Sequence, residues 1–425
     1  MDITAITKKL IGCPCGREHR AELKRVEIGP GLTEHTGEIL ASYRFPAGIL
    51  IVADKNTLSA SQGILSSLDK AGFNYMIKLY DDLRSADIAQ VNEVMSAARD
   101  REGILSVGTG SLNDICRYAA FLLGRKFAIF ATAPSMDGFA SGSAPIIEGG
   151  FKTTYPAVEP HVLIADTAVL AAAPAHLKAA GFGDMVAKYI ALADWRISAL
   201  LLGEYYCENI ANLTREALKR ITALADKVTG CDGETAGAIM EALVFTGVAM
   251  KLAGCVRPAS GAEHMISHFW EMKKLEAGEI SDFHGKKTGV ATVYLSRLYH
   301  ALADIKAIEA QTDHIDFDEL GRVFGENFIS GVVKMNTPPV TADLIPGVLE
   351  QRWSGVCRIV REEVPPPDRL RELMQRAGAA TNPDEIGISR ELALSGYRYH
   401  AYLRHRLTLS RLIPMIKNSD SLPVE

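Results

Sequence analysis

The feature that most constrains the fold is a series of short apolar runs, each followed by a stretch with helical periodicity. The clearest run covers residues 48–54, is rich in β-branched residues and ends in an acid. Continuous apolar runs of this kind are typical of parallel strands whose two faces are both covered. Similar runs occur at 26–29, 75–80, 103–108, 127–134 and 162–166, with helical patterns at 56–71 and 87–101. The alternation predicts an α/β fold with a doubly wound, mostly parallel sheet.

From Thr167 onward the pattern changes to Ala-rich helical periodicity. The expected helices cover roughly 174–202, 205–227, 233–253, 262–275, 289–312, 316–328, 338–352, 368–377 and 386–409. A chain of 425 residues exceeds the usual limit of about 250–300 residues for a single core. We therefore expect an α/β domain over 1–170 and a helical domain over 171–425.

Composition excludes several classes of protein. The net charge is −5 and no long Lys/Arg run occurs, so we expect no nucleic-acid partner. No apolar run reaches the roughly 18 residues of a membrane span, and no secretory signal pattern is visible. The seven cysteines are scattered, which suits a reducing cytoplasm. Cys13, Cys15 and His19 resemble half of a zinc knuckle, but no second Cys/His pair lies nearby, so we interpret them as a structural turn.

A mixed oxygen and nitrogen metal site is predicted from three stretches. Asp184 follows small residues and precedes an amphipathic run, which places it on the first turn of a helix, facing inward. His264 and His268 are four residues apart and share one helix face, and His284 follows in the third stretch. One carboxylate and two or three imidazoles suit a divalent first-row metal, and three protein ligands leave a position open for substrate.

The α/β half carries a candidate nucleotide site. The turn from Gly108 to Gly110 follows a buried strand and precedes a helix, where backbone N–H groups can approach a pyrophosphate. Asp54 ends an earlier strand and could accept hydrogen bonds from an adenosine ribose, or simply cap the helix that follows. The acid precedes the glycines, the reverse of the usual dinucleotide fingerprint, so an ordinary Rossmann dehydrogenase is disfavoured. The loop from Thr132 to Ser141 adds hydroxyls and Asp137 at a strand end.

Together these segments resemble the sn-glycerol-1-phosphate dehydrogenases, in particular the bacterial AraM-like branch. The wider superfamily holds glycerol dehydrogenase, iron-containing alcohol dehydrogenases and dehydroquinate synthase. The matching segments are Asp54, 108–114, 132–141, 183–184, 264–268 and 284–285, in the family's order. The resemblance implies a dehydroquinate synthase-like fold, with a nucleotide-binding domain followed by a helical metal-binding domain.

The resemblance also implies roles for individual residues. Asp184, His264 and His284 would ligate the metal, and Asp137 and His268 would contact substrate beside Asp184. Asp184 and His268 would be the catalytic residues, with His268 orienting a hydroxyl, relaying a proton or fixing a ligand. The cofactor site would be lined by Asp54, Gly108, Thr109, Gly110, Ser111, Leu112, Thr132, Ser135 and Ser141. Thr109 to Ser111 replaces the Gly-Gly-Lys that many relatives carry.

The implied reaction is the metal-dependent reduction of dihydroxyacetone phosphate to sn-glycerol 1-phosphate. Asp54 favours NAD(H) over NADP(H), because a carboxylate repels the 2′-phosphate, although NADP(H) is possible. Zinc, nickel and iron all suit the ligands. Lys188, Lys286 and Lys287 are candidates for the substrate phosphate, and a homodimer is expected from the family. The alternatives are glycerol dehydrogenase on the free ketone, a dehydroquinate synthase-like lyase, and a non-catalytic nucleotide-binding protein.

Overall fold

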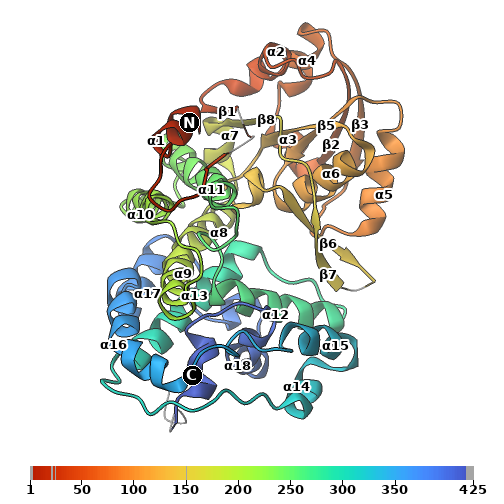
Figure 1. Ribbon diagram of the computed structural model, residues 1–425. Coiled ribbons are helices and arrows are strands. Elements are labelled where there is room, and N and C mark those ends of the chain that lie inside the picture. Colours follow the sequence, from red (N-terminus) through yellow and green to blue (C-terminus); the bar gives the residue numbers. More distant parts are fainter. Residues whose placement is uncertain (1–2, 21–22, 24, 150, 418–425) are drawn as a thin grey trace.

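The computed structural model describes residues 3–20, 23, 25–149 and 151–417. Its α/β half and its mainly helical half are stacked one above the other (Figure 1). The main sheet has the order β1 (Val26–Gly29), β8 (Val162–Asp166), β5 (Lys126–Ala131), β4 (Gly103–Gly108), β2 (Gly48–Asp54) and β3 (Asn74–Tyr80). Every neighbouring pair is parallel, which confirms the predicted sheet.

Both faces of this sheet are covered, as the continuous apolar runs predict. Ile49 and Ile51 of β2 pack in one core with α2 (Thr36–Ser42) and α4 (Ile64–Lys70). Leu50 and Val52 point to the opposite core, with α5 (Ile88–Ala97) and α6 (Gly110–Leu123). Successive side chains of a strand alternate between its two faces, so a strand buried on both sides must be apolar throughout.

The remaining elements complete the two halves. In the first are α1 (Ile3–Lys9), α3 (Lys55–Ala60), the antiparallel hairpin β6 (Ser143–Glu148) and β7 (Phe151–Pro156), and α7 (Thr167–Ala172). In the second are α8 (Ala175–Val186), α9 (Lys188–Leu202), α10 (Glu208–Thr222), α11 (Gly233–Ala253), α12 (Ala262–Glu276), α13 (His284–Ala303), α14 (Phe317–Phe324), α15 (Glu326–Met335), α16 (Pro346–Glu363), α17 (Pro367–Arg376) and α18 (Arg390–Tyr399).

Several predicted boundaries were wrong, for local reasons. The helix expected at 56–71 is two helices, α3 and α4, because Gly63 adopts a φ of 104° between them. The helix expected at 316–328 is divided at Gly325, with a φ of 79°. The helix expected at 174–202 is divided at Ala187 into α8 and α9. The β6–β7 hairpin was not predicted.

Glycines let α8 cross α13 and the loop after β5 at very short range. A Cβ on Gly181 would lie 1.9 Å from the carbonyl oxygen of Pro134. On Gly183 it would lie 2.4 Å from the Gly285 carbonyl oxygen, and on Gly285 2.0 Å from that of Ala180. The small residues before Asp184 are therefore helical contact points. The prediction that they form a turn, with Asp184 on the first turn of a helix, was wrong, since Asp184 lies in the last turn of α8.

One described helix, α11, has the length and apolar composition of a membrane span. In the structure 78% of its most apolar window is buried inside the protein. Met240, Val244 and Val248 of this helix pack in the core that also contains the α5–α6 face of the sheet. Its apolarity is accounted for by burial on all sides.

Gly285→Ala tests whether the close helix contact holds the site together. We expect unfolding free energy to fall by about 1–3 kcal/mol, because the added methyl group would force α8 and α13 apart. Gly331→Ala is the matched control, because this exposed glycine of α15 has nothing within 4 Å of an added Cβ. Urea denaturation measures both. Equal stabilities for the two variants would contradict the account of α8–α13 packing.

Candidate active site

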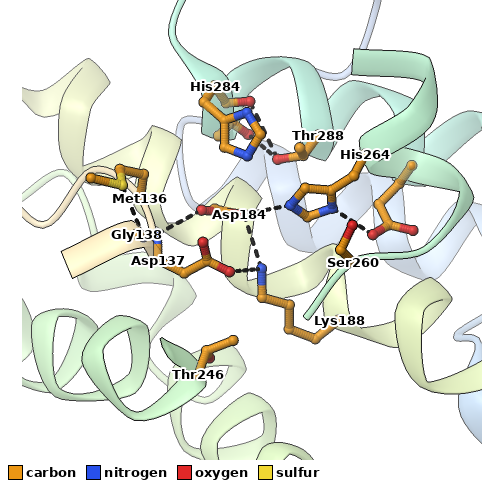
Figure 2. Close-up of polar contacts among 12 residues, drawn as sticks. Met136, Asp137, Gly138, Asp184, Lys188, Thr246, Ser260, His264, His284 and Thr288 are labelled. Atoms are coloured by element: carbon orange, nitrogen blue, oxygen red, sulfur yellow. Dashed lines mark hydrogen bonds and ion pairs between the residues drawn. The ribbon is translucent and has the colours of Figure 1, made fainter. Parts of the chain in front are cut away.

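Three of the predicted ligands converge from three helices. Asp184 of α8, His264 of α12 and His284 of α13 each offer an atom, and these atoms lie within 4.8 Å of one another. The Nε2 atom of His264 is 3.8 Å from Oδ1 of Asp184, and the rings of His264 and His284 have centroids 5.0 Å apart. Figure 2 shows both rings directed toward the Asp184 carboxylate. A carboxylate and two imidazoles gathered in this way fit a divalent metal ion.

The imidazole of His264 is oriented by a carboxylate that the sequence analysis did not identify. Its Nδ1 atom donates to Oε1 of Glu263, 2.6 Å away, so Nε2 is left to face Asp184 as an electron-pair donor. Glu263 is fully buried, and its Oε1 also accepts from the backbone N–H of Gly261 at 2.7 Å. A carboxylate behind a histidine is a typical support for a metal ligand.

Two carboxylates and one lysine form a buried charge cluster beside these ligands. Nζ of Lys188 lies 3.0 Å from Oδ1 of Asp184 and 2.6 Å from Oδ2 of Asp137. The backbone N–H of Asp137 donates to Oδ2 of Asp184 at 2.8 Å. Burial by itself would lower the pKa of Lys188, but the two carboxylates raise it above its ordinary value. Lys188 is therefore a cation that neutralises carboxylates, and it is already paired.

His268 lies next to the three candidate ligands. Its ring centroid is 6.2 Å from that of His264 and 6.0 Å from that of His284. The pKa of His268 is held well below its ordinary value, first by burial and then by the neighbouring His284. The pKa of His284 is lowered in the same way, by burial and then by His264. Both imidazoles are therefore neutral near pH 7, and a neutral imidazole can accept a proton or a metal ion.

The predicted nucleotide residues gather at one edge of the sheet. Asp54 ends β2, Gly108 ends β4 and Thr132 follows β5, and these three strands are neighbours. The strand order reverses between β2 and β4, and such a switch point is where doubly wound sheets bind ligands. The structure also shows that Asp54 caps α3, since its Oδ1 accepts from the backbone N–H of Thr57 at 2.8 Å.

The loop after β4 leads directly into α6. An added Cβ on Gly108 would lie 2.4 Å from Cδ1 of Leu112, so a larger residue there would displace the Leu112 side chain. Thr109 is the N-cap of α6, and its side chain makes no capping hydrogen bond, so it is available to pair with Ser135, 2.8 Å away between hydroxyl oxygens. Ser111 donates to the carbonyl of Arg84 at 3.2 Å.

Ser141 lies at the far end of the loop that follows β5. Its hydroxyl contacts that of Ser143, with 3.0 Å between the oxygens. Its carbonyl accepts from the buried guanidinium of Arg117 at 2.8 Å. The structure therefore anchors this end of the loop to α6.

Comparison with known proteins gives the family. Residues 27–174 match the model of the iron-containing alcohol dehydrogenases. A glycerol-1-phosphate dehydrogenase [NAD(P)+] from Halalkalibacterium halodurans is 37% identical over 297 residues, covering 68% of this chain and 73% of that protein. One from Bacillus licheniformis is 30% identical over 422 residues, covering 97% and 94%. This chain belongs to the glycerol-1-phosphate dehydrogenase family.

The fold agrees with that assignment. An archaeal alcohol dehydrogenase from a Red Sea brine pool superposes with a TM-score of 0.62 at 14% identity, covering 90% of this chain and 91% of that one. The chain has the iron-containing alcohol dehydrogenase fold. Its glycerol-1-phosphate dehydrogenase relatives and its match to the iron-containing alcohol dehydrogenases make it an oxidoreductase that uses a nicotinamide nucleotide and a metal.

Lys188→Met tests the charge cluster. Removing one partner of a buried ion pair typically costs roughly 3–5 kcal/mol, and here two carboxylates would lose their shared cation. We expect the unfolding free energy of metal-free protein, measured in chelator, to fall by about that amount. Lys286→Met is the control, since Lys286 pairs with the partly exposed Asp282. An unchanged stability of Lys188→Met would show that Asp137 and Asp184 are not both ionised.

Proposed function

We propose that this protein interconverts dihydroxyacetone phosphate and sn-glycerol 1-phosphate with NAD(P)(H), using one metal ion held by Asp184, His264 and His284. One observation carries the proposal. The loop from Thr132 to Ser141 connects the nucleotide edge with the metal cluster, since Ser135 contacts Thr109 while Asp137 contacts Asp184 and Lys188. A cofactor and a metal-bound substrate would thus meet at this loop.

The metal and the cofactor supply the reactive chemistry when bound. A divalent ion polarises a substrate carbonyl as a Lewis acid, and the reduced nicotinamide supplies hydride. The protein's task is to hold these groups. We assign residues 1–170 to nucleotide binding and 171–425 to metal and substrate binding. Zinc, nickel and iron all remain compatible with one carboxylate and two imidazoles.

The nucleotide would lie across the carboxyl ends of β2, β4 and β5. We propose that Gly108 to Leu112 receives the pyrophosphate at the N-terminus of α6, and that Thr132, Ser135 and Ser141 line the remainder. Asp54 would bind the adenosine ribose with the carboxylate oxygen that does not cap α3, which favours NAD over NADP.

Two residues would bind the substrate hydroxyls and transfer the proton. His268 is neutral near pH 7 and next to the cluster, so one ring nitrogen can donate its proton to the oxygen that develops negative charge while the other nitrogen takes up a proton from water. Asp137, held by Lys188, would accept a hydrogen bond from a substrate hydroxyl. Lys188 would keep Asp137 and Asp184 ionised and in place.

Of the three lysines considered for the substrate phosphate, the contacts favour Lys287. It lies one turn beyond His284 on α13, is almost fully buried, and has its Nζ 3.4 Å from Oε2 of Glu271. Lys152 of β7 lies 2.8 Å from the other oxygen of Glu271, so two cations share one carboxylate and one positive charge is left over. Glu271 is one turn from His268 on α12. This leaves a net positive charge close to the proposed substrate position.

His264→Ala should lose the metal ion held with Asp184 and His284, and more than about 100-fold of the turnover, because one ligand and its Glu263 support are removed. The assay follows NADH oxidation with dihydroxyacetone phosphate and, in parallel, dihydroxyacetone. His405→Ala, at an exposed histidine, is the control.

The same assay on the native protein distinguishes the alternatives. Turnover of the free ketone alone would indicate a glycerol dehydrogenase. A bound metal without NADH oxidation would indicate a dehydroquinate synthase-like lyase or a non-catalytic protein.

Lys287→Met should raise the KM for dihydroxyacetone phosphate roughly 10-fold or more, because a charged hydrogen bond to the phosphate is lost. The KM for the free ketone should stay unchanged. Lys286→Met is the matched control from the neighbouring position.

Burial lowers the pKa of Lys287 to about 8, so the lysine loses its charge as the pH rises through that value. The KM of the native protein should therefore rise above about pH 8. Equal effects on both ketones would exclude Lys287 as the phosphate ligand.

A further inference from the structure

A second cluster of metal-ligating side chains lies away from the active site. Cys13, Cys15 and His19 follow α1, and the structure brings Cys207 to them from nearly 190 residues away. One atom from each of the four residues lies within 4.8 Å of the others. The sequence analysis interpreted the first three as a structural turn because no further Cys or His was near in sequence. The fourth ligand comes from the fold.

We propose that Cys13, Cys15, His19 and Cys207 bind a structural zinc ion. Three thiolates and one imidazole form a closed tetrahedral set, which leaves no position for substrate. This site is separate from the Asp184, His264 and His284 cluster and independent of the proposed activity.

Three of the distances between the ligand atoms are close to those of a tetrahedron around zinc. Zn–S bonds of about 2.3 Å place tetrahedral sulfur atoms about 3.8 Å apart. The Sγ atoms of Cys13 and Cys207 are 3.6 Å apart, and Sγ of Cys207 is 3.7 Å from Nε2 of His19. Sγ of Cys15 is 3.2 Å from the same Nε2. A disulfide would need two sulfurs at about 2.05 Å, and all seven cysteines, which lie within the described residues, are free.

The histidine is held in the tautomer that zinc requires. Its Nδ1 atom lies 2.7 Å from the carbonyl oxygen of Leu252, which can only accept, so Nδ1 carries the proton. Nε2 is left with a free electron pair directed at the three thiols. His19 is buried, with only 4% of its surface exposed. A backbone carbonyl behind a ligating histidine is a common support for bound metal.

Hydrogen-bond donors and a helix N-terminus lie around the sulfur atoms. Cys207 is the N-cap of α10, where the helix dipole favours negative charge. The side-chain amide of Asn209 donates to Sγ of Cys13 at 3.2 Å. The hydroxyl of Tyr205 lies 3.6 Å from Sγ of Cys15. These donors lie around the sulfur atoms, as expected of groups that surround a metal–thiolate centre.

The ion would fasten the N-terminal segment to the helical half. The segment after α1 contacts both α10 and α11, through the hydrogen bonds Asn209–Cys13 and His19–Leu252, and Leu10 packs in the same core as Cys207, Leu252 and Trp195. Trp195 is on α9, two turns beyond Lys188, and its Nε1 donates to the carbonyl of Tyr205 at 2.6 Å. The zinc site therefore supports the helix that carries the lysine of the active-site cluster.

The test measures bound metal in a variant that lacks His264, one of the proposed active-site ligands. His264→Ala protein, purified and desalted, should still contain one zinc ion per chain by elemental analysis. Adding Cys207→Ser should remove that zinc. Cys231→Ser, at an exposed cysteine, should leave it in place. Zinc retained after Cys207→Ser, or none present in His264→Ala alone, would overturn the proposal, as would iron in its place.

A second measurement uses no cysteine substitution and so does not depend on a variant that could misfold. Metal-free His264→Ala protein titrated with Co²⁺ alone should show the intense near-ultraviolet charge-transfer band of cobalt bound to thiolates, saturating at one ion per chain. Zn²⁺ added afterwards should abolish this band. No thiolate band, with thiol titration showing that all seven cysteines are still free, would overturn the site.

Discussion

The site depends on how closely α8 approaches α13. Gly183 and Gly285 bring the backbones of these helices together, at separations where any Cβ would collide with a carbonyl oxygen, and Gly181 does the same for α8 and the loop after β5. At that distance Asp184, near the end of α8, and His284, at the start of α13, are close enough to bind the same metal ion. Side chains as short as aspartate reach only a few ångströms, so a metal site built from different helices requires helices in near contact. The glycines matter here for their missing side chain and not for their flexibility.

The buried carboxylates around the candidate ligands have partners. Asp137 and Asp184 share Lys188, and Glu263 holds His264. Asp194, whose pKa burial raises to about 7, accepts from the backbone N–H of Ala262 at the start of α12 and from the hydroxyl of Tyr299. Burying carboxylates is costly unless they are hydrogen-bonded or paired, so these contacts stabilise the α12 start and fix the ligands in position.

The sequence predicted those parts of the fold that repeat a local pattern. Continuous apolar strands, the Gly-rich turn at Gly108 and the i, i+4 pair His264–His268 could all be identified from spacing. Contacts between distant segments could not. Lys188 was a candidate phosphate ligand until Asp137, 51 positions earlier, proved to be its partner, and Cys13 had no visible fourth ligand until Cys207 lay beside it. Glu263 was overlooked although it precedes His264, because adjacent residues on a helix ordinarily face different ways.

The central claim is that Asp184, His264 and His284 together hold one metal ion. A crystal of the metal-loaded protein, with anomalous scattering measured on both sides of the metal's absorption edge, tests this directly. We predict one anomalous peak at this cluster, bonded to one carboxylate oxygen of Asp184 and to a ring nitrogen of His264 and of His284. Density for an ordered protein with no such peak among these three residues would contradict the account, whether or not a metal ion is bound at the cysteine cluster.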